Sequence, residues 1–270
     1  MKYSDQMAEW LKDLGYDTFY FVGGGNIMHL TESLDRHLNA IPVIHEVAAV
    51  IAAEYHNHLA GSEKALALVT AGPGITNTVT GLAGAYLESR YVLVIGGQVK
   101  TDDLSKGDTR QNGIQEIDGV TICEPLTTYS VRLDKPITKK EFHKYAVSNK
   151  NIRKAPVFLE IPLDVQAAQY VSNIGEIVQE DEVQTMPFNE KQLAVMLDML
   201  RSSKRPVFLL GGGVEIESAH RVERYAVENS IPVATTWNGA DLISSECPVY
   251  IGRPNTWGQR SSNILIQQAD

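Results

Sequence analysis

Short apolar runs alternate along the chain with longer stretches of mixed polarity. Five runs are predicted as strands, at residues 18–22, 41–44, 65–69, 91–95 and 157–161. Two of the stretches between them, residues 47–59 and 77–87, are rich in alanine or glycine and are predicted as helices. Buried strands separated by helices are typical of a mostly parallel sheet with helices on both faces. We therefore predict an α/β fold.

A second strand and helix pattern follows a stretch without periodicity. Residues 169–189 contain several acidic side chains and the turn-prone pair Met186-Pro187, which indicates a linker. Beyond it we predict helices at 191–201 and 218–229 and strands at 206–210 and 231–235. The expected organisation is a first domain at residues 1–168, a linker at 169–189, and the incomplete N-terminal part of a Rossmann-like domain at 190–270.

Composition narrows the class of protein. Hydrophobic residues at 43% and charged residues at 21% are typical of globular domains. The formal net charge of -9, without a Lys/Arg cluster, argues against nucleic-acid or anionic-membrane partners. No apolar run approaches the ~20 residues of a membrane span, so we expect a cytoplasmic protein. Cys123 and Cys247 are far apart and lack metal-ligand spacing, so neither a disulfide nor a metal site is expected.

Two segments where a predicted strand gives way to a helix carry the candidate chemistry. Glu46 follows the strand at 41–44, and Gly72-Pro73-Gly74 follows the strand at 65–69. Open α/β sheets bind ligands beyond the carboxyl ends of their strands, and glycines let backbone approach a flat ring closely. Each segment also has an ordinary explanation, since a glutamate in the first helical turn complements the helix dipole and Gly-Pro-Gly forms turns.

In their order and spacing these segments resemble the pyrimidine-binding domain of thiamine diphosphate (ThDP) enzymes of the acetolactate synthase type. The resemblance extends to Gly96-Gly97-Gln98-Val99 and to Ile114-Gln115-Glu116-Ile117-Asp118. It implies that Glu46 activates the cofactor by hydrogen bonding to its pyrimidine ring. It also implies that Gln115 projects toward the thiazolium and the substrate.

The resemblance assigns further residues to the pyrimidine pocket. They are Val22, Gly23, Gly24, Pro73 and Asn77. The first turn departs from the family pattern, because Gly23 stands where proline is usual and Phe21 where the first glycine is usual.

Gly211, Gly212 and Gly213 follow the strand at 206–210 and resemble the first glycine turn of the family's central domain. Some members of that family bind FAD there, others bind an adenine nucleotide, and others bind nothing. These alternatives stay open at the level of sequence.

The resemblance implies a ThDP-dependent 2-keto acid decarboxylase or carboligase. The Mg²⁺ ligands of the family lie in a Gly-Asp-Gly to Asn segment that these 270 residues do not show, so we expect this chain alone to be inactive. It would be a piece of a longer homo-oligomeric synthase or a subunit paired with a separate diphosphate-binding chain. The alternative is a noncatalytic nucleotide-binding or regulatory module on the same scaffold. The 2-keto acid substrate and its acceptor stay open.

Overall fold

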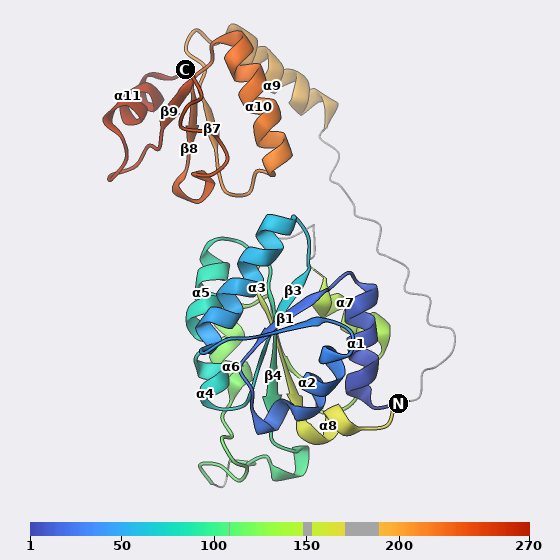
Figure 1. Ribbon diagram of the computed structural model, residues 1–270. Coiled ribbons are helices and arrows are strands. Elements are labelled where there is room, and N and C mark those ends of the chain that lie inside the picture. The colour runs from blue at the N-terminus through green and yellow to red at the C-terminus, as the bar shows by residue number, and fades with distance from the viewer. Residues whose placement is uncertain (108, 148–152, 171–188) are drawn as a thin grey trace. The chain divides into compact units, whose positions relative to one another are not determined.

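The computed structural model describes residues 1–107, 109–147, 153–170 and 189–270 (Figure 1). The chain divides into two compact units, Met1–Val183 and Gln184–Asp270, and each is described by itself. Most of the predicted linker, residues 171–188, lies outside the described residues. Gln169 pairs with Lys2 in an isolated bridge, and Tyr170 packs against Tyr3 and Trp10, so both belong to the first unit.

The first unit is built on a six-stranded parallel sheet in the order β2-β1-β3-β4-β6-β5. Its strands are β1 Thr18–Phe21, β2 Asn39–Pro42, β3 Ala65–Val69, β4 Leu93–Gln98, β5 Tyr129–Arg132 and β6 Val157–Pro162. Strands β3, β4 and β6 are buried throughout, which explains their nearly continuous apolar sequence. The predicted fold class is therefore confirmed.

Helices cover both faces of this sheet (Figure 1). Those that share one core are α1 Tyr3–Asp13, α2 Met28–Asp35, α7 Lys139–Ala146 and α8 Leu163–Ala167. Those that share the core on the opposite face are α3 Glu46–Ala60, α4 Pro73–Thr76, α5 Val79–Leu87 and α6 Gly119–Cys123. Short 3-10 helices occur at η1 Gly25–Ile27, η2 Thr101–Asp103 and η3 Glu124–Leu126.

The boundaries of α3 follow from its sequence. His45 is the N-cap, and its Nδ1 accepts a hydrogen bond from the backbone N–H of Val47. Gly61 ends the helix with a φ of 69°, a conformation that favours glycine. On α5, a Cβ at Gly81 would lie 2.6 Å from Val50 Cβ, so this glycine lets α5 approach α3 closely.

The second unit contains a three-stranded parallel sheet in the order β7-β8-β9. Its strands are β7 Phe208–Leu210, β8 Val233–Thr235 and β9 Tyr250–Gly252, its helices are α9 Glu190–Ser202, α10 Ile216–Asn229 and α11 Arg260–Gln268, and η4 spans Trp237–Gly239. Its core is formed mainly by β7, β8, α10 and residues 242–247. Among all the described helices of the chain, none combines the length and the apolar character that crossing a membrane requires.

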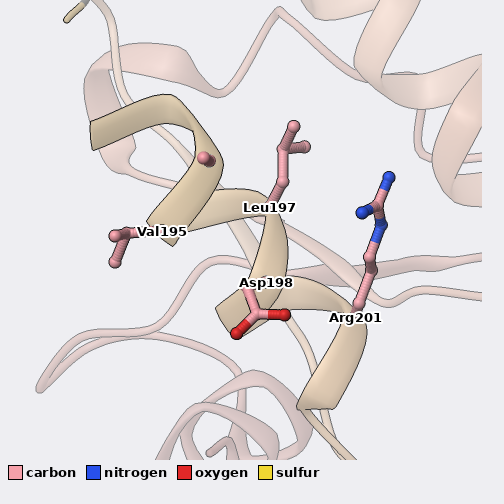
Figure 2. A pocket seen from close by; sticks show the side chains of 5 residues that line it. Val195, Leu197, Asp198 and Arg201 are labelled. Atoms are coloured by element: carbon pink, nitrogen blue, oxygen red, sulfur yellow. The ribbon is translucent and has the colours of Figure 1, made fainter. Parts of the chain in front are cut away.

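Helix α9 contributes no buried residue and exposes several large apolar side chains. An open hollow beside it is lined by Ala194, Val195, Leu197, Asp198 and Arg201, all from this one helix (Figure 2). Ligand sites usually enclose most of a ligand between several elements. We therefore assign no ligand to this hollow.

Candidate functional site

The candidate site lies at the carboxyl edge of the six-stranded sheet, where the chain leaves neighbouring strands in opposite directions. From β1 it passes through α2 to β2, and from β3 it passes through α4 and α5 to β4. Strands β1 and β3 are adjacent, but α2 and α5 pack on opposite faces. Open parallel sheets bind their ligands at such a switch point.

Glu46 and Asn77 meet at this edge. Asn77 Nδ2 donates a hydrogen bond to Glu46 Oε2 at 2.9 Å. Glu46 is the first residue of α3 and is only 7% exposed, whereas Asn77 is the half-buried C-cap of α4. The amide fixes one carboxylate oxygen, and the first turn of α3 favours negative charge. The structure thus brings together two residues that the sequence predicted for one site.

Thr70, the residue after β3, is surrounded by glycines. A Cβ on Gly24 would lie 2.3 Å from Thr70 Cβ, so the turn after β1 rests directly on Thr70. A Cβ on Gly74 would lie 3.0 Å from Thr70 Cγ2 and 3.6 Å from Glu46 Oε1. A larger residue at Gly74 would fill the space between Thr70 and Glu46, and one at Gly24 would clash with Thr70.

The Thr70 hydroxyl is a functional candidate that the sequence analysis missed. Its Oγ1 is buried and has no hydrogen-bond partner within the described residues. A buried hydroxyl without a partner costs free energy, so a polar ligand atom at this position would be stabilised. The only sequence signal for Thr70 is its place two residues before the Gly72-Pro73-Gly74 turn.

Gln115 lies against the same turn from another direction. A Cβ on Gly72 would lie 2.6 Å from the Gln115 carbonyl oxygen, and both residues have a φ of 64°. Such a φ is uncommon for a residue with a side chain. The structure therefore places the backbone of Gln115 beside the turn, with its side chain exposed to solvent.

The other predicted pocket residues occupy the rim of the site. Pro73 is the exposed first residue of α4, Val22 is half-buried, and Gly23 is exposed. Helix α8 also fixes the turn after β1, because the Asn26 carbonyl oxygen accepts a hydrogen bond from Gln166 Nε2 at 2.8 Å.

These residues fit one end of a flat, polar heterocycle. Gly23 has open space at its Cβ position, the Thr70 hydroxyl lacks a partner among the described residues, and Glu46 supplies a carboxylate. An aminopyrimidine carries both donors and acceptors, so it complements this set of groups. Within the described parts of the chain, no group of three or more His, Cys, Asp or Glu side chains is placed to hold a metal ion.

The predicted glycine turn of the second unit also meets a neighbouring strand end. A Cβ on Gly212 would lie 2.6 Å from the Asn238 carbonyl oxygen, whereas Gly213 faces open space. The Arg253 guanidinium lies 5.1 Å from the centroid of the Trp237 ring, and Arg253 Nε is buried without a hydrogen-bond partner among the described residues. Gly211 and these residues form a second candidate site.

Comparison with known proteins identifies two regions of the chain. Residues 1–122 match the model of the thiamine pyrophosphate enzyme N-terminal TPP binding domain. Residues 193–270 match the model of the thiamine pyrophosphate enzyme central domain. Thiamine pyrophosphate is another name for ThDP. The first region contains Glu46, Thr70, Asn77 and Gln115, and the second contains the glycine turn after β7.

Similar proteins include acetolactate synthase large subunits. The one from Lactococcus lactis is 29% identical over 275 residues, which cover 99% of this chain and 46% of that protein. Isozyme 1 of Escherichia coli is 28% identical, with 98% of this chain and 46% of the relative covered. The acetolactate synthase of Arthrospira platensis is 32% identical over 84% of this chain and 40% of its own length. The chain thus spans about half the length of the curated relatives it matches.

Proposed function

Since this chain belongs to the thiamine pyrophosphate enzymes, carrying their N-terminal and central domains, we propose that it supplies Glu46 as the cofactor-activating glutamate of an acetolactate synthase-like enzyme. The observation that carries the proposal is the hydrogen bond from Asn77 Nδ2 to Glu46 Oε2 at the switch point of the sheet. The similarity to acetolactate synthase large subunits supports the choice of reaction class.

Bound ThDP would supply the electron sink for decarboxylation of a 2-keto acid and transfer of the remaining fragment. Each protein group has a separate task. Asn77 holds Glu46 Oε2, which leaves Oε1, the atom nearer Gly74, to share a proton with a pyrimidine ring nitrogen. Gly72 and Gly74, which pack closely against Gln115 and Thr70, would hold the turn beside the ring, and Thr70 Oγ1 would offer the ring a hydrogen bond. Gln115, whose carbonyl oxygen lies against Gly72, would face the thiazolium and the substrate.

The proposed partner is a second chain that carries the diphosphate and Mg²⁺ contacts. Helix α3 exposes Ala48, Ile51, Tyr55 and Leu59, the last at 73%. Their spacing of three or four residues puts them on one helical face, and this apolar face begins within a turn of Glu46. Contiguous exposed apolar surface marks interaction sites. A second copy of a longer chain and a separate diphosphate-binding subunit both fit this role.

The proposal can be tested on the 270-residue chain by NMR. Titration of ¹⁵N-labelled protein with ThDP should shift the backbone amides of Gly72, Gly74 and Asn77 and the side-chain amide of Asn77. A noncatalytic module, the rival function, predicts that these signals stay in place. Shifts confined to residues 189–270 would contradict the proposal in the same experiment.

A nucleotide site on the second unit is a separate candidate function, favoured by the buried Nε of Arg253, which has no hydrogen-bond partner in the described parts of the chain. We propose that Gly211, Gly212 and Gly213 approach the phosphates of FAD or of an adenine nucleotide, since a glycine turn after a parallel strand is suited to phosphate. Titration with FAD and with ADP, followed by flavin fluorescence and calorimetry, distinguishes the two ligands. If neither FAD nor ADP changes the fluorescence or the calorimetric signal, the proposed nucleotide site is refuted.

A further inference from the structure

Gln98 and Glu160 form a polar pair inside the first unit, and the proposed chemistry makes no use of it. Both residues are fully buried, Gln98 at the end of β4 and Glu160 in β6. Gln98 Nε2 donates a hydrogen bond to Glu160 Oε1 at 3.0 Å. A Cβ on Gly119 would lie 2.7 Å from that same oxygen, so the start of α6 closes over the carboxyl group.

The Gln98 amide connects the two ends of one loop. Its Oε1 accepts a hydrogen bond from the backbone N–H of Val99 at 2.9 Å. Its Nε2 also donates to the carbonyl oxygen of Ile117 at 3.0 Å. Residues 99–107 and 109–118, here called the Gln115 loop, lie between these contacts. One buried side chain therefore holds the point where the loop leaves the sheet and the point where it returns.

Glu116 stabilises the Gln115 loop through hydrogen bonds to the backbone of the loop. Its carboxylate accepts hydrogen bonds from the backbone N–H groups of Ser105, Asn112 and Gly113. The neighbouring residue, Gln115, has its carbonyl oxygen against Gly72. Any shift in the ends of the loop would thus be transmitted to the turn that contains Pro73 and Gly74.

Burial of the Glu160 carboxyl group at this position is energetically unfavourable. Its Oε2 is buried without a hydrogen bond among the described residues, and the nearest cation, Arg132 Nη1, is 3.8 Å away. Asp118 and Asp134 are the other charged groups that act on it, and both repel negative charge. An apolar side chain at this position of β6 would be buried with a smaller free-energy penalty. The hydrogen bond to Gln98 is the feature that an apolar residue cannot replace.

We propose that Glu160 and Gln98 are positioning residues that act through the Gln115 loop. Glu160 fixes the orientation of the Gln98 amide, Gln98 clamps both ends of the loop, and the loop presses Gln115 against Gly72 at the edge of the cofactor site. The consequence for catalysis rests on the proposed function. The clamp itself does not, and it can be measured without ThDP.

Hydrogen exchange followed by mass spectrometry on the 270-residue chain tests the clamp. Gln98→Met keeps the volume and removes both loop contacts. Glu160→Leu removes the acceptor for Gln98, whereas Glu160→Gln retains an oxygen that accepts from Gln98 Nε2. The matched control is Glu54→Gln, which changes another buried glutamate: Glu54 belongs to α3, outside the loop, and accepts a hydrogen bond from Arg90. Peptides from β3 report on the rest of the domain.

We expect Gln98→Met to speed exchange in the Gln115 loop on the order of 10-fold while β3 stays protected. Glu160→Leu should act in the same direction, and Glu160→Gln should remain near the wild type. If Glu160→Leu does not fold, the contrast between Gln98→Met and Glu160→Gln decides. The proposal is overturned if Gln98→Met leaves the loop unchanged, or if loop and β3 loosen by the same factor. Failure of ThDP to bind would instead count against the proposed function alone.

Discussion

A 2.9 Å hydrogen bond joins Asn77 to Glu46, although the two residues are 31 positions apart in the chain. Glu46 begins α3, which follows β2, and Asn77 lies between α4 and α5, which follow β3; α3 and α5 pack in one core on the same face of the sheet, and this packing brings the two residues together. The carboxylate therefore reaches the site already oriented. The proposed function requires such an orientation, because a carboxyl group that shares a proton must point at the ring nitrogen.

Removal of the Asn77 amide should impair catalysis more than folding. In the enzyme assembled with the proposed diphosphate-binding chain, we expect Asn77→Ala to lower turnover about 10-fold, because Glu46 loses its orienting contact. The free energy of unfolding should fall by only about 1 kcal/mol, since Asn77 is half-exposed. Thr76→Ala, which changes an exposed neighbour on α4, is the matched control for urea unfolding and turnover. Equal effects of the two variants on turnover would refute the orienting role.

Gly72 should not tolerate a side chain. Gly72→Ala forces a positive φ on alanine and places its Cβ 2.6 Å from the Gln115 carbonyl oxygen, so we expect a loss of about 1 to 3 kcal/mol of stability. Gly84→Ala is the control, because a Cβ there, in the middle of α5, meets no other described atom within 4 Å. That variant should be neutral or more stable by about 0.5 to 1 kcal/mol. Thermal unfolding of both variants measures the contrast, and similar losses would be inconsistent with it.

Glu160 gives the domain a defined dependence of stability on pH. Burial raises the pKa of Glu160 from 4.5 to about 7, with Arg132 and Gln98 opposing and Asp118 and Asp134 adding to the rise. Its neutral form stabilises the native state fully below pH 4.5, and that contribution is lost as the pH rises through about 7. Relative to Glu160→Gln, the wild type should therefore lose up to about 3 kcal/mol between pH 4.5 and pH 8.

Glu141→Gln is the control of opposite sign for this titration. Hydrogen bonds from the backbone and side chain of Thr138 lower the pKa of Glu141, so its ionised form stabilises the native state at neutral pH. That stabilisation should disappear as the pH falls below the usual range of a glutamate. Denaturant unfolding of the wild type and both variants at a series of pH values makes the comparison. A difference between wild type and Glu160→Gln that is constant with pH would show that Glu160 does not titrate in this range.

The 270-residue chain should bind ThDP weakly. Its described residues offer groups for the pyrimidine ring and no cluster of metal ligands, whereas charged diphosphate and Mg²⁺ contacts contribute much of such an affinity. We expect a Kd on the order of 1 mM in calorimetric titration with ThDP and Mg²⁺, which corresponds to about 4 kcal/mol. Micromolar binding would show that this chain contacts the diphosphate after all.

The parts of the structure that the sequence predicted are those that a local pattern determines. Strand β3 was predicted with its observed bounds, because Ala65–Val69 is buried throughout and flanked by polar residues. Strand β5 was missed, since Tyr129–Arg132 is half-buried and alternates apolar with polar residues over only four positions. Strand β4 was predicted to end before Gly96, yet Gly96, Gly97 and Gln98 lie within it, where Gly96 makes room for Phe158.

In the candidate site, the sequence predicted residues that belong to a recognisable motif. Glu46 and Asn77 were assigned through the resemblance, and the structure adds that they touch. Thr70 and Glu160 could not be assigned in this way, because their importance depends on which polar atoms are left unpaired after folding. Gln98 lies in a segment that carries the resemblance, but its part in the loop depends on its contacts with Ile117 and Glu160. Pairing of that kind involves residues as far apart as Gln98 and Glu160, which no local pattern connects.

Exchange of the C2 proton of ThDP tests most directly whether Glu46 activates the cofactor. The exchange rate is compared between wild type and Glu46→Gln, with ThDP bound to the enzyme assembled with the proposed diphosphate-binding chain. The neutral amide cannot share a proton with the pyrimidine, so we predict exchange slower by ~10²- to 10⁴-fold with folding and assembly preserved. Glu54→Gln, on the same helix and also buried, is the matched control and should exchange normally. Exchange at the wild-type rate in Glu46→Gln would contradict a role for Glu46 in activating the cofactor. If stability also falls by only about 0.3 to 1 kcal/mol, Glu46 is a residue that complements the dipole of α3.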